Sequence, residues 1–193
     1  MNQDLAEEIE YMKDLLVKSG FFDDDEIVEI LEDQFIEEEI DFSDIDISPN
    51  NFENINFNKL EKVFKALAGE DIVAIHNCGY DIEEGVADAF ELYVHLVNNK
   101  FRPEGFCFYT FEDVEDAIWD EKLKITFGDF ENSEEKALEI GKIVEKCISK
   151  EFSIDWDGTI NNQIEINPFK WDKSFDGEKE YEIEGAYDTF VNR

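Results

Sequence analysis

Hydrophobic positions follow helical spacing in the first third of the chain and then change to strand-like runs near residue 70. Apolar side chains recur at helical spacing over residues 5–16, 27–35 and 57–68, which predicts three helices. Gly20 supplies a stop for the first of them. The stretch 42–56 is rich in Asp, Ser and Asn and contains a proline, so we expect a loop there.

Beyond residue 70, short apolar or alternating runs predict strands that are separated by amphipathic segments. The predicted strands are 72–75, 105–110, 123–127, 152–156 and 163–166. The predicted helices between them are 81–98, 111–119 and 132–149. Helices between strands permit parallel crossovers, whereas the last two strands read as a hairpin. The pattern therefore predicts an α+β protein with a mixed sheet of about five strands and helices packed on it.

Three segments follow from this pattern. Residues 1–50 form an acidic helical segment that precedes the sheet, and residues 57–168 form the α+β domain. Residues 169–193 form an acidic tail that keeps several aromatic side chains, so we expect it to dock on the rest of the protein.

The charge of the chain restricts the classes of molecule that it can bind. The 193 residues contain 51 acidic and 17 basic side chains, which gives a net charge of −34. Residues 1–50 hold 18 of the acids and only Lys13 and Lys18 as bases. Such a surface repels phosphate backbones and anionic lipid headgroups, which excludes nucleic acid and membrane surfaces as main partners. A basic protein surface is the partner that this charge favours, although the same charge also serves solubility alone.

The three cysteines, Cys78, Cys107 and Cys147, are too few and too scattered for a disulfide framework. The first residues lack the basic and apolar regions of a signal peptide, and no apolar run reaches membrane-spanning length. We therefore expect a cytoplasmic protein with reduced thiols.

Several segments of the second half resemble a known family. They are Gly105-Phe106-Cys107-Phe108-Tyr109, Thr126-Phe127-Gly128, Ile154-Asp155-Trp156-Asp157-Gly158-Thr159 with Ile164-Glu165-Ile166, and the pair Cys78-Gly79. Over about residues 66–171 the chain resembles DUF6891, a family of uncharacterised bacterial proteins. The resemblance supports the predicted architecture and implies no activity.

Asp155 and Asp157 form the most suggestive catalytic pattern. A strand that ends in Asp-x-Asp-Gly-Thr resembles the first motif of haloacid-dehalogenase-type phosphatases, in which Asp155 would be the nucleophile and Asp157 the acid or base. Such an enzyme needs further residues from later strands, and only 34 residues follow Thr159. Asp-Gly at a strand end is also ordinary chemistry for a tight turn, which is the interpretation we prefer.

His76 and Cys78 form a His-x-Cys pair directly after a predicted buried strand. Zinc would need two more ligands, and no second Cys/His pair occurs in the sequence. A partly buried histidine beside a core thiol is the interpretation we prefer. A nucleophilic Cys78 activated by His76 would lack the usual third residue that orients the histidine.

No cofactor-binding, phosphate-binding or metal-binding motif stands out, so we assign no catalytic residue, no metal and no cofactor. We predict a non-catalytic protein that uses its acidic surface to bind a basic protein. The candidate binding residues are His76, Cys78, Trp156 and Asp157. The alternative is a small hydrolase or metal-dependent enzyme centred on His76/Cys78 or on Asp155/Asp157.

Overall fold

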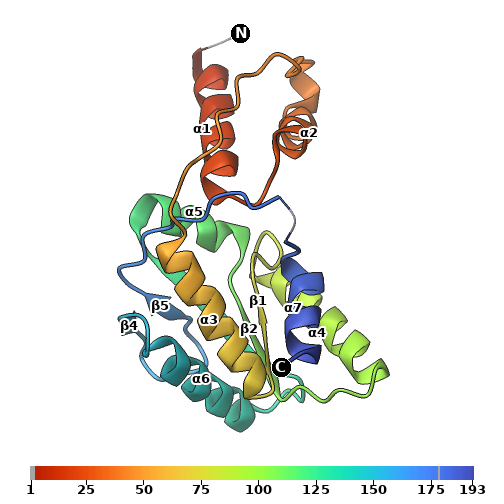
Figure 1. Cartoon of the computed structure of the whole chain (residues 1–193), viewed down its shortest axis with the longest axis vertical. Coiled ribbons are helices and arrows are strands. Elements are labelled where there is room, and N and C mark those ends of the chain that lie inside the picture. The colour runs from red at the N-terminus through yellow and green to blue at the C-terminus, as the bar shows by residue number, and fades with distance from the viewer. Residues whose placement is uncertain (1–2, 178) are drawn as a thin grey trace. The chain divides into compact units, whose positions relative to one another are not determined.

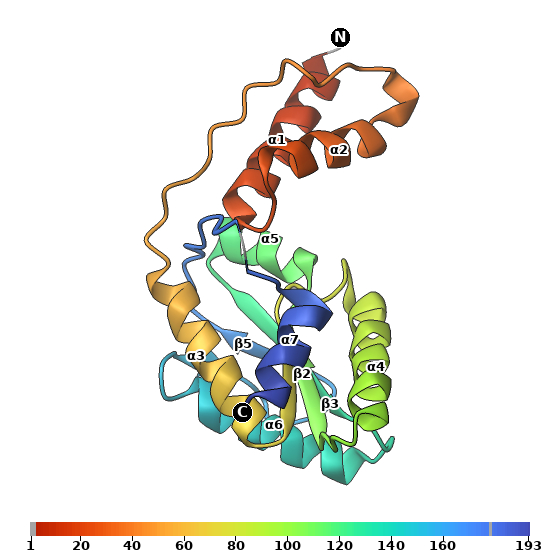
Figure 2. The same ribbon diagram turned by 45° about the vertical axis from the view of Figure 1, so that its right-hand side comes forward.

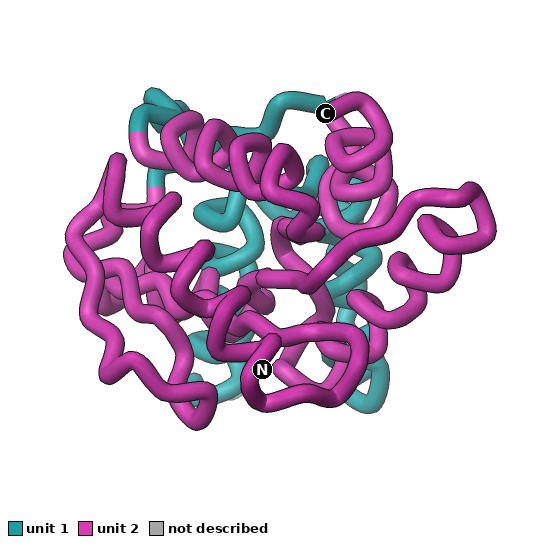
Figure 3. The backbone as a smooth tube through the Cα atoms, turned by 90° about the horizontal axis from the view of Figure 1, so that it is seen from below, with its two compact units in different colours: residues 1–55, 172–178 teal, residues 56–171, 179–193 magenta. Residues whose placement is uncertain are grey.

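The computed structural model describes residues 3–177 and 179–193, and they divide into two compact units. The first unit is Met1–Ile55 with Asp172–Glu178, and the second is Asn56–Trp171 with Lys179–Arg193 (Figure 3). The C-terminal tail is thus shared between the two units. No helix among the described residues is both long and apolar enough to cross a membrane.

The first unit contains the predicted N-terminal helices. They are α1 (Gln3–Ser19) and α2 (Asp24–Gln34), followed by the short η1 (Ile36–Glu38). Gly20 adopts a φ of 73°, a conformation that favours glycine and ends α1. Asp23 caps α2 in a reciprocal capping box with Glu26, which satisfies two backbone donors at the helix start.

A C-terminal segment completes this helical unit. Lys173 is only 1% exposed, and its ammonium donates to the Gly20 carbonyl at 2.5 Å. It also lies 4.9 Å from the centre of the Phe21 ring, which is within cation–π range. Asn54 binds Ser174 through two hydrogen bonds, at 2.7 and 2.8 Å. Residues more than a hundred positions apart in the sequence therefore share one small core.

The second unit is built on a five-stranded sheet with the strand order β1-β2-β3-β5-β4. The strands are β1 (Ile72–Ile75), β2 (Gly105–Phe108), β3 (Leu123–Asp129), β4 (Ile154–Asp155) and β5 (Ile164–Ile166). β1 and β2 are parallel, and the remaining pairs are antiparallel. The predicted mixed sheet, including its terminal hairpin, is confirmed.

Five helices accompany this sheet among the described residues. They are α3 (Ile55–Gly69), α4 (Ile82–Asn98), α5 (Phe111–Asp120), α6 (Glu134–Ile148) and α7 (Glu182–Val191). α6 packs on β2 and β3, and α7 packs on β1 and α4. In Figures 1 and 2, α7 lies between α3 and α4. The hydrophobic pattern predicts the first four of these helices but not α7.

Alternation along β1 decides which helices its side chains meet. Val73 and Ile75 join a buried cluster with Leu92 of α4 and Phe190 of α7. The next residue, His76, points to the opposite side because successive side chains of a strand alternate. There its ring meets α3. β1 is an edge strand, and α7 covers that edge, which shields its unpaired backbone groups.

Candidate functional site

The loops that follow β1 and β2 form one connected layer at the carboxyl ends of the two parallel strands. The backbone N–H of Cys78 donates to the Tyr109 carbonyl at 2.8 Å, and that of Phe111 donates to the Gly79 carbonyl at 3.0 Å. Each loop leads into a helix, α4 capped by Asp81 and α5 capped by Thr110. In sheets with parallel strands this end is where ligands commonly bind, so it is the first place to look for a site.

His76 is held rigidly in this layer by aromatic neighbours. Its ring stacks on Phe64 of α3, with ring centres 4.4 Å apart, and meets the edge of Tyr181 at 5.7 Å. Its Nδ1 atom lies 2.8 Å from the Tyr109 hydroxyl. Burial raises the pKa of Tyr109 well above its usual value, so this hydroxyl keeps its proton. If this hydroxyl donates to Nδ1, a neutral imidazole carries its own hydrogen on Nε2.

Cys78 occupies a different environment from His76. Its side chain is fully buried, and its thiol donates to the Gly85 carbonyl with a sulfur–oxygen distance of 3.4 Å. Burial raises its pKa, and the nearby charges of Asp88 and Glu182 raise it further. The thiol therefore stays protonated near neutral pH, and only the thiolate is a good nucleophile. Among the described residues, no three His, Cys, Asp or Glu side chains converge as a metal site would require.

Asp157 and Trp156 lie at the other edge of the sheet, in the β4–β5 connection. The Asp157 carboxylate accepts hydrogen bonds from Asn162 Nδ2 at 2.5 Å and from the Thr159 backbone and hydroxyl at 2.9 Å. These bonds lower its pKa, with the Asn162 bond contributing most. The Trp156 indole donates to the carbonyls of Thr159 and Asn162. Both side chains thus stabilise a turn, in which Gly158 has a φ of 77°.

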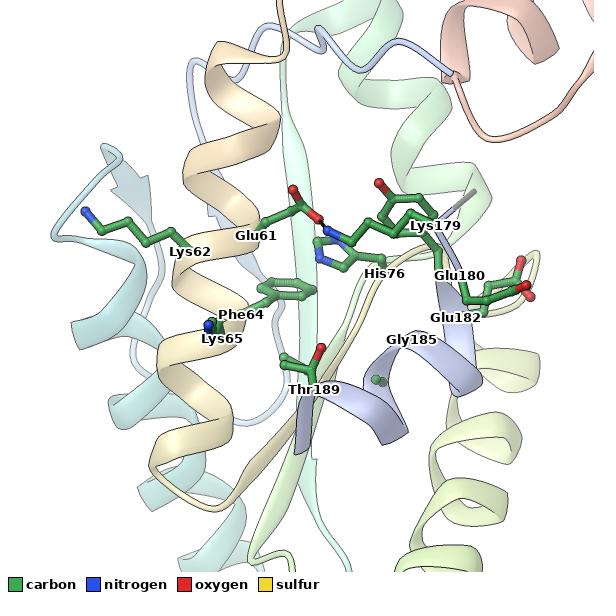
Figure 4. Close-up of a pocket in the computed structure, with 13 residues that line it drawn as sticks. Glu61, Lys62, Phe64, Lys65, His76, Lys179, Glu180, Glu182, Gly185 and Thr189 are labelled. Carbon is green, nitrogen blue, oxygen red and sulfur yellow. Dashed lines mark hydrogen bonds and ion pairs between the residues drawn. The ribbon is translucent and has the colours of Figure 1, made fainter. Parts of the chain in front are cut away.

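A cavity of about 270 Å³ lies beside His76, between α3 and α7. Phe64, His76 and Tyr181 contribute aromatic surface to its wall, and Ala74 and Thr189 also line it. Lys179 and Glu61 form an ion pair that joins the chain before α7 to α3 (Figure 4). Gly185 permits this arrangement, because a Cβ there would lie 2.2 Å from the Glu180 carbonyl oxygen.

A larger groove of about 820 Å³ lies on the other side of α7, between it and α4. Its lining contains the carboxylates of Glu91, Glu180, Glu182, Glu184 and Asp188. Apolar surface comes from Ile183 and Tyr187, and the one histidine is His95, whose Nε2 lies 3.6 Å from a Glu91 oxygen. The groove therefore combines strong negative charge with an apolar lining.

Asn77 links the β1 loop to the start of α7. It is 4% exposed and adopts a φ of 48°, a region that asparagine tolerates better than most residues. Its Nδ2 atom donates to Glu182 at 3.4 Å, and its Oδ1 atom has no hydrogen-bond partner among the described residues. The Glu182 backbone N–H donates to the His76 carbonyl at 3.1 Å, so two contacts seat α7 on this loop.

The structure places the four candidate binding residues at two separate edges of the sheet. His76 lines the cavity, whereas Cys78, Trp156 and Asp157 line neither the cavity nor the groove. The residues that sequence reasoning missed are Tyr109, Tyr181 and the carboxylates of the α7 segment. The one available signal was the aromatic content of the tail, which predicted docking without indicating where.

Comparison with known proteins gives one family. The model of a family described as a domain of unknown function, DUF6891, matches residues 50–175. No curated protein and no solved structure matches the chain.

Proposed function

We propose that this chain, which belongs to the DUF6891 family, binds a basic segment of a partner protein and carries out no chemistry on it. The observation that carries the proposal is the groove between α4 and α7, where five carboxylates surround an apolar lining. The proposal includes a cytoplasmic setting, which the three free and buried thiols support.

The groove suits a segment rich in lysine or arginine that also presents an apolar side chain. Glu184 and Asp188 lie one helical turn apart on α7, so their charges can face the same segment. Ile183 and Tyr187, which are only partly buried, offer apolar contact for an anchor residue. Interfaces gain most of their affinity from such buried anchors, while charge complementarity adds specificity and speeds association.

The N-terminal helical unit adds to the attraction at longer range. Its 18 acids in residues 1–50 face only Lys13 and Lys18, which pair locally with Glu10 and Asp14. Internal ion pairs therefore leave most of this charge uncompensated. Such a field raises the association rate of a basic partner and is screened beyond about 8 Å at physiological salt.

The proposal is tested with a short fluorescent peptide of lysine and leucine, whose binding is followed by fluorescence anisotropy. A glutamate and leucine peptide of the same length is the control ligand. The double variant Glu184→Gln/Asp188→Asn should weaken binding of the basic peptide about tenfold, which corresponds to about 1.4 kcal/mol. Raising the salt concentration should weaken binding to the unmodified protein as well.

A matched double variant separates the groove from general charge. Asp120→Asn/Glu139→Gln removes the same charge from exposed positions that do not line the groove. It should change the affinity less than about twofold, because distant exposed charges are screened. Equal weakening by both double variants, or equal binding of the acidic peptide, would reject the groove as the binding site.

A further inference from the structure

Helix α4 carries a row of apolar side chains outside the groove that it forms with α7. Six residues make up this row, which we call the apolar face of α4: Ile82, Val86, Phe90, Tyr93, Val94 and Val97. Ile82, Phe90 and Val94 are 46%, 40% and 54% exposed, and the other three are half-buried. None of the six lines the groove, so the face is a separate surface. We propose that it binds an amphipathic helix of a partner protein, whose apolar stripe is flanked by lysine or arginine.

The core of the second unit uses a different side of α4. The buried residues of this helix are Gly85, Ala89, Leu92 and Leu96, which recur every three or four positions. The apolar face continues this stripe around the helix, beyond the part that the core covers. In Figures 1 and 2, α4 lies at the outside of the second unit. Single exposed apolar residues are normal, whereas a contiguous row on one helix is typical of an interaction surface.

The residue types on this face are unfavourable for an exposed helix. Ile82 and Val94 are β-branched and Phe90 is aromatic, and such side chains lose rotamer freedom in a helix. Exposed helix positions are better served by alanine, glutamate or lysine. Neither helix propensity nor solubility therefore accounts for these three residues, whereas burial against a partner does.

The spacing of the row fits another helix. Its ridge residues follow one another at every fourth position: Ile82, Val86, Phe90 and Val94. They form a ridge of about 18 Å along α4, and ridges of this type interdigitate with those of a second helix in the most common form of helix packing. Phe130 broadens the ridge, because its ring stacks on Tyr93 at 4.4 Å and meets Phe90 at 5.3 Å. An extended strand, whose side chains repeat every second residue, would not match this spacing.

Charge selects the chemistry of the docking helix. Glu83, Glu84 and Glu91 are exposed on α4, and this helix contains no lysine or arginine. Basic residues beside the apolar stripe of the partner would face these carboxylates. A second copy of this chain would instead bring the same three acids to the contact, together with its own net charge of −34. Like charges thus oppose self-association through this face and favour a basic helix of a different protein.

The test uses two fluorescent peptides of leucine and lysine that have the length of α4 and the same composition. In one peptide leucine recurs at positions i, i+3, i+4 and i+7, which gives an amphipathic helix. In the other, leucine and lysine alternate, which gives the periodicity of a strand. Fluorescence anisotropy should show at least about tenfold tighter binding of the helical peptide. Ile82→Ser/Val94→Ser removes two exposed apolar side chains without changing the charge and should weaken that binding about tenfold.

A matched variant controls for the loss of apolar surface in general. Ile160 is 38% exposed and belongs to the β4–β5 connection, so Ile160→Ser should change the affinity less than about twofold. At position 94, Val94→Lys should weaken binding more than Val94→Glu, because only the lysine repels the basic flank of the peptide. Urea denaturation checks that each variant is folded, and substitutions at exposed positions of this kind leave stability nearly unchanged.

The same titrations separate this face from the groove. Both peptides are also titrated into Glu184→Gln/Asp188→Asn, which alters the groove and leaves the apolar face intact. Loss of helical-peptide binding in this variant but not in Ile82→Ser/Val94→Ser would assign the peptide to the groove and overturn the proposal. Equal binding of the two peptides to the groove variant, or equal weakening by Ile82→Ser/Val94→Ser and Ile160→Ser, would also overturn it. A dimer in sedimentation analysis that Ile82→Ser/Val94→Ser dissociates would overturn it too, since the face would then belong to a second copy.

Discussion

The two edges of the sheet contrast sharply in what surrounds their polar residues. At the β1 edge, His76 sits among rings contributed by α3, the loop after β2 and the segment before α7. At the β4–β5 edge, Asp157 is exposed and its hydrogen bonds reach only Thr159 and Asn162, within its own turn. A polar residue held by distant segments can shape a binding site, whereas one held by its own turn stabilises only that turn.

The contrast also explains why the His-x-Cys pair contributes a residue to a cavity whereas the Asp-x-Asp-Gly-Thr motif does not. Asp-x-Asp-Gly-Thr resembles a phosphatase motif, but the hydrogen bonds of the Asp157 carboxylate all lie within its own turn. His76 belongs to the weaker His-x-Cys pattern, yet it alone of the candidate residues lines the cavity. Position in the fold, rather than resemblance of a short motif, separates the two.

The largest effect should come from Gly85, beneath the β1 loop. A Cβ at this position would lie 2.4 Å from the Phe108 ring and 2.7 Å from the Cys78 carbonyl oxygen. Gly85→Ala should therefore lower the free energy of unfolding by about 2–3 kcal/mol through overpacking. Gly69→Ala is the matched control, because a Cβ there meets nothing within 4 Å, and it should be neutral or slightly stabilising. Urea denaturation of both variants measures the difference, and equal effects would contradict the tight packing at this edge.

Tyr109→Phe should have an intermediate effect and test the orientation of His76. Losing the hydroxyl removes the bond to Nδ1 and should lower the free energy of unfolding by about 1 kcal/mol. The proton on the neutral imidazole should also redistribute from Nε2 towards Nδ1, which ¹⁵N NMR detects. Tyr80→Phe changes an exposed tyrosine and should alter neither quantity. Unchanged His76 nitrogen shifts in Tyr109→Phe would show that the hydroxyl does not set the tautomer.

Asp113 predicts a specific pH dependence near the same edge. Its carboxylate accepts from the Thr110 backbone and hydroxyl at 2.9 Å, but burial dominates and raises its pKa above the usual 3.8. At a pH between the unfolded pKa of Asp113 and its raised folded pKa, the folded state binds more protons than the unfolded state. Stability contributed by Asp113 is therefore present below the unfolded pKa and lost as pH rises through the folded one.

Asp113→Asn removes this titration while preserving an acceptor for Thr110. Relative to the unmodified protein, the variant should gain stability as pH rises from about 4 to about 7, which urea denaturation at several pH values measures. A stability difference that stays constant over this range would rule out a raised pKa for Asp113.

The smallest effect should come from the β4–β5 edge. Asp157→Ala removes the hydrogen bonds to Asn162 and Thr159 and should lower the denaturation midpoint less than Gly85→Ala does. Because these bonds lower the pKa of Asp157, their contribution exists above the unfolded pKa and disappears as pH falls through the folded one. Asp155→Asn, the adjacent control, should change neither stability nor any activity. His76 NMR signals that shift in Asp157→Ala would show that the two edges are coupled.

The strands and most helices could be predicted because their signals are local. Ile72–Ile75 is a continuous apolar run, and Asp81 and Ser133 accept backbone hydrogen bonds at the starts of α4 and α6. α7 gave no such signal, since Gly185 interrupts it and its N-cap residue Tyr181 makes no side-chain cap. Its stability comes instead from packing on β1 and α4, which no local pattern reports.

The site was harder to predict for the same reason. His76 could be selected from its position after a strand, but its neighbours Phe64, Tyr109 and Tyr181 come from three distant segments. The carboxylates of the groove were visible only as part of a general acidic excess. Tertiary packing gathers them around an apolar lining, and the sequence alone does not show that gathering.

The buried Lys173 sets the order in which the first unit can be synthesised and folded. During synthesis, α1 and α2 leave the ribosome long before the residues that complete their core, Lys173 and Ser174. The Gly20 carbonyl and the Asn54 side chain must wait for these late partners, because isolated short helices are marginal in water. Residues 1–55 are thus completed only after residues 172–177 have been made, and a nascent chain stalled before residue 172 would hold this acidic region only loosely structured.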